Sequence, residues 1–113
     1  MSAITTHILD ISRGCPARDV IVLLERQTTT DWELVGAERT NDDGRVDDLL
    51  DPKAPLQTGN YRLTFDAETY FAEQLIESFY SQITVTFVVS DTNQHYHVPL
   101  LLSPFGYSTY RGS

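Results

Sequence analysis

Alternation of apolar and polar positions with a period of two runs through most of this chain, and that period is typical of β-strands. In residues 4–9 the even positions (Ile4, Thr6, Ile8) share one face, while Thr5, His7 and Leu9 share the other. The same reading predicts further strands at residues 20–24, 32–38, 45–46, 61–65, 83–89, 95–102 and 105–111. The chain is therefore expected to be mostly β.

Turn residues separate these segments and suggest how they connect. An Asp91-Thr92-Asn93 turn lies between residues 83–89 and 95–102, so these two strands are expected to form a β-hairpin. Pro99 has no amide proton. It should lie at a sheet edge, at a bulge, or where its nitrogen points out of the ladder of hydrogen bonds.

One short helix is expected after Asp66, a good N-cap residue with Glu68 in the following turn. Apolar residues at spacing four, such as Phe71 and Leu75, continue the helical pattern as far as Phe79. One helix among many short strands predicts an all-β fold, a two-sheet antiparallel sandwich. Residues 1–113 are expected to form a single domain.

Composition narrows the class of protein. Of the 113 residues 41% are hydrophobic, which suffices for a core, but no apolar run approaches the roughly 20 residues that cross a bilayer. The first ten residues lack the basic start and apolar stretch of an export signal. Cys15 is the only cysteine, so no disulfide forms within the chain. We expect a cytoplasmic protein with no membrane partner.

The net charge of −8, from 16 acidic and 8 basic side chains, disfavours nucleic acids as partners. The cluster of Asp42, Asp43, Asp47 and Asp48 lacks the spacing of a calcium loop and is expected to face water. An anionic ligand would need a local cation. Arg45, at a boundary between loop and strand, is a candidate for that role, although the residues around it favour a solvated turn arginine.

Two of the three histidines, His95 and His97, are two residues apart on a predicted strand and therefore leave the same face. Such a pair can take part in catalysis. With His7 from another strand it can also bind zinc, or the imidazoles can be ordinary solvated and hydrogen-bonded groups. No nucleophile or phosphate-binding motif is present, and Cys15 has no neighbouring histidine to activate it.

The C-terminus is unusual because aromatic and β-branched residues continue almost to its end. Such a terminus is expected to be docked on the body of the protein. Ser113 would then present a hydroxyl, an amide and an ionised α-carboxylate at one fixed point.

Four motifs in order along the chain resemble the 5-hydroxyisourate hydrolases, also called transthyretin-like proteins. They are Ile4-Thr5-Thr6-His7-Ile8-Leu9-Asp10, Thr40-Asn41-Asp42-Asp43-Gly44-Arg45, His95-Tyr96-His97-Val98-Pro99-Leu100-Leu101 and Tyr110-Arg111-Gly112-Ser113. The resemblance implies a transthyretin-like sandwich, a homotetramer, and an active site without a metal or organic cofactor. It also implies that His7, Arg45, His97 and Ser113 line that site. Hormone-carrying transthyretin shares the fold but lacks the histidine pattern and the terminal motif.

The reaction implied by this resemblance opens a cyclic amide in an oxidised purine, the step after urate oxidation in purine breakdown. We expect His97 or His7 to activate water while the other imidazole donates a proton, with the choice left open. Arg45 would hold developing negative charge. Ser113 and Tyr110 would bind substrate and set the tautomer or orientation of a histidine. Two alternatives remain: a carrier of small ligands that performs no chemistry, and a metal hydrolase with histidine ligands.

Overall fold

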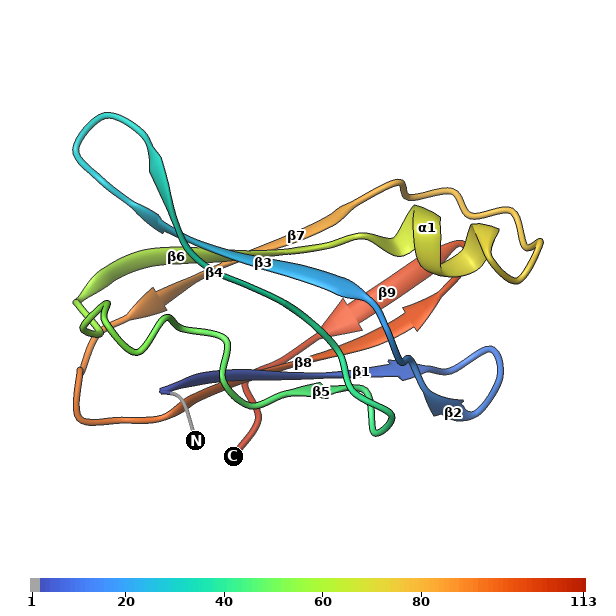
Figure 1. Cartoon of the computed structure of the whole chain (residues 1–113), viewed down its shortest axis with the longest axis horizontal. Coiled ribbons are helices and arrows are strands. Elements are labelled where there is room, and N and C mark those ends of the chain that lie inside the picture. Colours follow the sequence, from blue (N-terminus) through green and yellow to red (C-terminus); the bar gives the residue numbers. More distant parts are fainter. Residues whose placement is uncertain (1–2) are drawn as a thin grey trace.

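Two β-sheets face each other in the computed structural model, which describes residues 3–113 (Figure 1). The elements are β1 (Ile4–Asp10), β2 (Cys15–Pro16), β3 (Ile21–Gln27), β4 (Trp32–Arg39), β5 (Arg45–Val46), β6 (Gly59–Phe65), α1 (Ala67–Ala72), β7 (Ile83–Val89), β8 (Tyr96–Ser103) and β9 (Gly106–Thr109). One sheet has the strand order β2-β1-β8-β9, with β5 also paired to β1, and the other has the order β4-β3-β6-β7. The predicted sandwich with one short helix is confirmed.

Strand pairing is antiparallel except between β1 and β8, which run parallel with Thr5 opposite His97. The predicted hairpin of residues 83–89 and 95–102 is wrong, because β7 pairs with β6 while β8 lies in the other sheet. The connection between them is a corner from one sheet to the other. At this corner the Tyr96 hydroxyl accepts hydrogen bonds from the backbone N–H groups of Ser90 and Asp91, at 3.2 and 3.0 Å.

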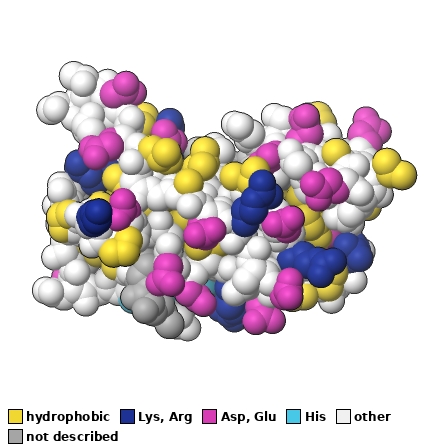
Figure 2. All heavy atoms as spheres, viewed as in Figure 1, with side chains coloured by type: hydrophobic (Ala, Val, Ile, Leu, Met, Phe, Trp, Pro, Cys, Tyr) yellow, Lys and Arg dark blue, Asp and Glu magenta, His cyan; other side chains and the backbone are white. Residues whose placement is uncertain are grey.

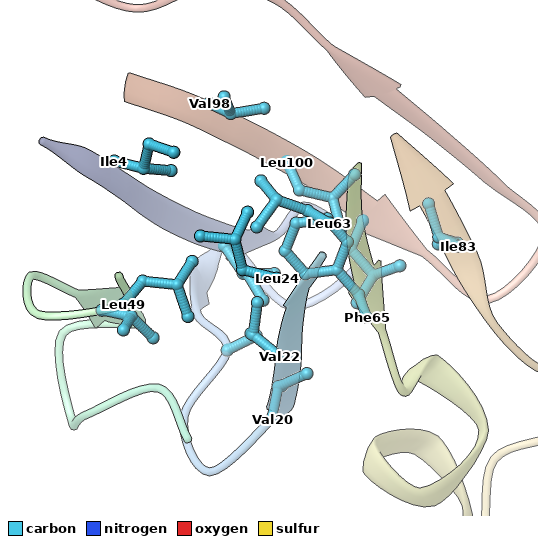
Figure 3. Close-up of a cluster of buried hydrophobic side chains, with 14 of the residues drawn as sticks. Ile4, Val20, Val22, Leu24, Leu49, Leu63, Phe65, Ile83, Val98 and Leu100 are labelled. Atoms are coloured by element: carbon cyan, nitrogen blue, oxygen red, sulfur yellow. The ribbon is translucent and has the colours of Figure 1, made fainter. Parts of the chain in front are cut away.

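The core lies between the two sheets and is built from the inward positions of their strands (Figure 3). Ile4 of β1, Leu24 of β3 and the Leu63 and Phe65 side chains of β6 lie in this cluster (Figure 3), and all four are fully buried, as is Ile8 of β1. Burial of such side chains contributes about 1.5–3 kcal/mol each, before the entropy of ordering the chain is counted. The alternation in β1 therefore fixes its orientation: even positions point into the core and odd positions point outward.

Helix α1 begins where predicted. The Asp66 side chain caps it by accepting a hydrogen bond from the backbone N–H of Thr69 at 3.2 Å. The helix ends at Ala72, so the apolar spacing up to Phe79 does not extend it, and Leu75 is 95% exposed. Leu75 has a positive φ of 59°, which stops the helical turn.

A buried hydrogen bond ties α1 to β1. The Tyr70 hydroxyl donates to the fully buried carboxylate of Asp10 at 2.7 Å. Burial, followed by this interaction with Asp10, raises the pKa of Tyr70 to about 12. The helix is therefore fixed against the end of β1.

Pro99 lies in β8, between β1 and β9, where its missing amide proton has to be tolerated. The pairing of β8 with β9 ends at Leu100 opposite Thr109 and resumes only at the isolated bridge between His97 and Gly112. Pro99 therefore lies opposite a gap in the ladder, as predicted.

Charged side chains are spread over the molecular surface. In the view of Figure 2, acidic groups are scattered over the face with Lys and Arg between them. No helix within residues 3–113 has the length and apolar character needed to cross a membrane.

Candidate active site

The outer face of β1 carries the first part of the candidate site. Because Ile4, Thr6 and Ile8 point into the core, Thr5 and His7 point away from the second sheet. The C-terminus lies on this same side of the molecule (Figure 1). The polar side chains of β1 and the end of the chain are therefore on one side of the sandwich.

Strand register places the other candidate residues beside Thr5 and His7. Arg45 of β5 lies directly opposite His7, and Val46, the next residue, is buried opposite Thr6. His97 of β8 lies opposite Thr5 in the parallel pair. Residues that are opposite one another share a face of the sheet. His7, Arg45 and His97 thus emerge on the outer face, from three different strands.

The last residues are docked against the same region, which confirms the expectation for the C-terminus. The backbone N–H of Gly112 donates to the carbonyl of His97 at 2.8 Å. The Arg111 guanidinium donates to the Gln94 side chain at 2.8 Å and lies 4.6 Å from the centre of the Tyr96 ring. These contacts direct Ser113 toward β8.

Gly112 lies so close to His97 that only glycine fits. A Cβ atom at this position would be 2.6 Å from Cδ2 of His97 and 3.1 Å from Cγ of Pro99. The glycine of the terminal motif therefore lets the chain end pass alongside the imidazole.

A cavity of about 250 Å³ lies where these groups meet. It is lined by Thr5, Arg45, Asp47, His95, His97 and Ser113. Three of the four residues implied by the family resemblance therefore share one cavity, and the fourth, His7, lies opposite Arg45 in the adjacent strand. Tyr110 is separate: it lines a neighbouring apolar cavity of about 150 Å³ between β7 and the chain end.

Burial lowers the pKa of both His7 and His97, and the Arg45 guanidinium lowers both further. His95 and His7 add to the lowering at His97, whereas Asp47 raises that pKa. A hydrogen bond with the Asp43 backbone partly opposes the shift at His7. Both imidazoles are consequently neutral at pH 7, the form in which a histidine can accept a proton.

Sequence reasoning missed Thr5 as a member of this group. Its hydroxyl is 2.8 Å from Nδ1 of His97 and 3.1 Å from Nε2 of His95, and the residue is only 3% exposed. Its position two residues before His7, on the same face of one predicted strand, could have indicated that Thr5 lies beside the site.

The other candidate groups show no comparable arrangement. Among residues 3–113, no three His, Cys, Asp or Glu side chains are grouped so that they could hold a metal ion. Asp42, Asp43, Asp47 and Asp48 are exposed, as expected. Cys15 is partly buried in the short strand β2.

The two-sheet sandwich with one short helix places the chain in the class of transthyretin-like proteins. Residues 4–112 match the model of the HIUase/Transthyretin family. The chain belongs to this family.

Similar proteins support that assignment. A probable 5-hydroxyisourate hydrolase of Caenorhabditis elegans is 49% identical over 112 residues, which are 99% of this chain and 82% of the relative. The structure of 5-hydroxyisourate hydrolase from Klebsiella pneumoniae has a TM-score of 0.84 and 41% identity, covering 97% of this chain and 98% of that one. Sea bream transthyretin, solved in complex with thyroxine, has a TM-score of 0.91 and 28% identity, covering 98% of this chain and 95% of that one.

Proposed function

We propose that this protein is a 5-hydroxyisourate hydrolase that acts in purine degradation. The observation that carries the proposal is the shared cavity of Arg45, His97 and Ser113 beside His7, in a chain 49% identical to a probable hydrolase of this type. All four groups lie within one patch of the outer face although they are far apart in sequence.

Hydrolysis of a cyclic amide adds one water molecule across a C–N bond. The water oxygen forms a new bond to the carbonyl carbon, the C–N bond breaks, and a proton is delivered to the departing ring nitrogen. The enzyme has to accept a proton from water, stabilise charge on the carbonyl oxygen, and protonate the nitrogen.

The imidazoles suit the two proton transfers because both are neutral at pH 7, so each can accept a proton and later return it. General acid–base help of this kind contributes about 10²–10⁴ in rate. In the proposal, His97 or His7 activates the water and the other imidazole donates to the substrate or to the leaving nitrogen.

Arg45 supplies the local cation that a protein of net charge −8 needs to hold an electron-rich substrate. Its planar fork can donate to two neighbouring oxygens of an oxidised purine and stabilise the negative charge that develops during attack. Ser113 and Tyr110 are proposed to bind substrate. Ser113 is supported by its place in the cavity, whereas for Tyr110 the support is the sequence resemblance alone.

The test uses freshly generated 5-hydroxyisourate, whose ultraviolet band disappears slowly without an enzyme. We expect the band to decay faster in proportion to the protein concentration. A decay rate equal to the spontaneous one, in folded protein, contradicts the proposal.

A second candidate function is that of a carrier that binds a small aromatic ligand without chemistry. The high TM-score of 0.91 with a transthyretin that binds thyroxine favours it. The same assay separates the two, because a carrier leaves the decay unchanged while binding an aromatic ligand. The identity of 41% with the Klebsiella hydrolase against 28% with that transthyretin favours the enzyme.

The assembly is also part of the proposal. We propose that residues 1–113 act as one domain and that four copies associate, as the family resemblance implies. Both β7 and β9 are edge strands of their sheets and offer unpaired backbone groups for association between copies.

A further inference from the structure

The Thr5 hydroxyl lies between two imidazoles on the outer face of the first sheet. It is 2.8 Å from Nδ1 of His97 and 3.1 Å from Nε2 of His95, and the ring centroids are 6.4 Å apart at an interplanar angle of 16°. Thr5 is 3% exposed, so water has little access to it. The three side chains therefore form one connected group, with His95 at its exposed end.

A hydroxyl group has a single proton and two acceptor lone pairs, so Thr5 can donate to only one of the two imidazoles at a time. If Thr5 donates to His97, then Nδ1 of His97 is unprotonated and its Nε2 carries the proton. If Thr5 donates to His95, it accepts a hydrogen bond from the Nδ1–H group of His97, and Nε2 of His97 is left with a free lone pair. The tautomers of the two histidines are thus coupled through one oxygen.

Nε2 is the nitrogen of His97 that is left for the substrate. Nδ1 is taken by Thr5, and no other described residue makes a side-chain hydrogen bond to the His97 ring. The cavity next to it also contains the Arg45 guanidinium. The positive charge of Arg45 attracts a lone pair on Nε2 and repels an N–H group there. It therefore favours the tautomer of His97 in which Nε2 is unprotonated.

We propose that Thr5 and His95 are positioning residues for the proposed hydrolysis: Thr5 donates to His95 and accepts from His97, which leaves Nε2 of His97 as the base. The inference rests on the proposed function for its catalytic meaning. The tautomer coupling itself does not depend on the reaction.

Protonation of His95 reverses this arrangement. A charged imidazole carries protons on both nitrogens, so Thr5 can only accept from His95, and its own proton becomes available for donation to Nδ1 of His97. Nε2 of His97 then carries a proton and no longer serves as a base. His95 is the exposed member of the group and is in contact with solvent.

Other charged or titratable groups also face the Thr5, His95 and His97 side chains, so the test variants should leave those groups unchanged. They are His7 on β1, Arg45 on β5, Asp47 after β5, Arg111 beside the His95 carbonyl, and the terminal carboxylate of Ser113. His95 itself is one of the groups that lower the pKa of His97, after burial and Arg45. All of these stay unchanged when only Thr5 is substituted.

The test compares Thr5→Val, which keeps the shape of the side chain and removes the hydroxyl, with Thr5→Ser, which keeps the hydroxyl. Thr64→Val, on the outer face of the other sheet, is the matched control. Nitrogen NMR of histidine-labelled protein reports which ring nitrogens carry protons across the pH range. Steady-state kinetics with 5-hydroxyisourate give kcat and KM over the same range.

We expect Nδ1 of His97 to carry the proton in the wild type at neutral pH, and we expect that proton to shift to Nε2 as the pH is lowered. In Thr5→Val this response disappears, and kcat falls by about tenfold or more while KM stays within about threefold. Thr5→Ser restores the NMR response and most of kcat.

Two results overturn the inference: a Thr5→Val variant with wild-type nitrogen signals and wild-type kcat, or a Thr5→Ser variant that behaves like Thr5→Val. Failure of the proposed function is a different result. It would be seen as a wild-type protein that does not accelerate hydrolysis, and the NMR comparison would still decide the coupling.

Discussion

The imidazole of His97 is held on two sides, by the Thr5 hydroxyl at Nδ1 and by Gly112 beside Cδ2. These contacts fix the ring without using Nε2. In the proposed reaction this positioning would make the ring ready before the substrate arrives, which saves the cost of ordering it during the reaction.

Removal of the charged or imidazole groups is expected to lower turnover without unfolding the protein. His97→Ala and Arg45→Ala should each reduce kcat/KM for 5-hydroxyisourate by at least about tenfold, which corresponds to about 1.4 kcal/mol of transition-state stabilisation. Arg39→Ala is the control for Arg45, because Arg39 is an exposed arginine at the end of β4 whose guanidinium forms an ion pair with Asp19 at 3.7 Å, away from the candidate cavity. A His97→Ala variant with the wild-type rate removes that residue from the site.

The histidines also make a prediction about pH. Burial and Arg45 lower the pKa of His7 and His97 below the ordinary 6.5, so NMR titration should show both midpoints below that value. Arg45→Gln should move both midpoints upward, because it removes a positive charge. Midpoints at or above 6.5 in the wild type contradict the electrostatic account.

The same shifts affect stability. Below pH 6.5 the unfolded chain binds protons at these histidines before the folded protein does. Their contribution therefore makes the free energy of unfolding decrease as the pH falls from 6.5 toward the lower folded pKa values.

Much of this residue-level picture follows from sequence. A period of two places Thr5 and His7 on the face opposite Ile4, and the structure confirms that division. The period does not say which strand lies beside which, because it determines only the direction of side chains. For that reason the register of Arg45 with His7, and of His97 with Thr5, had to come from the structure or from the family resemblance.

At the scale of elements, the chain end is the part of the site with the least regular structure. Gly112→Ala places a Cβ atom 2.6 Å from the His97 ring, so either the ring or the chain end has to move. We expect a loss of kcat/KM of at least about tenfold with little change in the free energy of unfolding.

Gly106→Ala provides the control for this variant. Its Cβ would make only an ordinary contact, 3.7 Å from Oγ of Ser103. Removal of residues 110–113 should impair activity as Gly112→Ala does. Full activity of the truncated protein would show that the docked end is not part of the site.

The connection after β5 depends on another close approach. A Cβ atom added at Gly36 in β4 would overlap the carbonyl oxygen of Leu49, and the N–H of Asp51 donates to the carbonyl of Val35 at 3.0 Å. A side chain at position 36 would push this connection away from β4. Gly36→Ala should lower the free energy of unfolding by about 1–3 kcal/mol, measured by urea denaturation. A stability equal to that of Gly106→Ala contradicts this packing.

The wrong prediction of a hairpin between residues 83–89 and 95–102 shows that sequence patterns do not determine which strands pair. Turn residues after β7 and before β8 are the same whether the chain folds back in one sheet or crosses to the other. The Tyr96 hydroxyl, which holds the backbone at Ser90 and Asp91, favours the crossing, and that contact is not visible in a pattern of apolar positions.

On the scale of the whole molecule, the candidate cavity opens on the outer face of a sheet rather than in the core between the two sheets. Association of copies through that face would enclose it. We expect light scattering to give a mass of four times the 12.8 kDa of the chain. An active protein with the mass of one chain would show that the site functions without the proposed assembly.

The fold could be predicted from physical patterns in the sequence, but the residues of the candidate site were expected to lie together only because of the family resemblance. The sandwich could be predicted from alternation and turn signals. The proximity of His7, Arg45 and Ser113 could not be predicted from those patterns, and it was expected only from the resemblance of four motifs to a family. Tyr110 came from the same resemblance, and in the single chain it lines a different cavity.

The most direct test of the account follows the decay of freshly prepared 5-hydroxyisourate in the presence of the wild type and of His97→Ala, at equal concentrations of folded protein. The account predicts rapid loss of the ultraviolet band with the wild type and a loss at least about tenfold slower with the variant. Equal rates for the two proteins, or a wild-type rate equal to the spontaneous one, would contradict it.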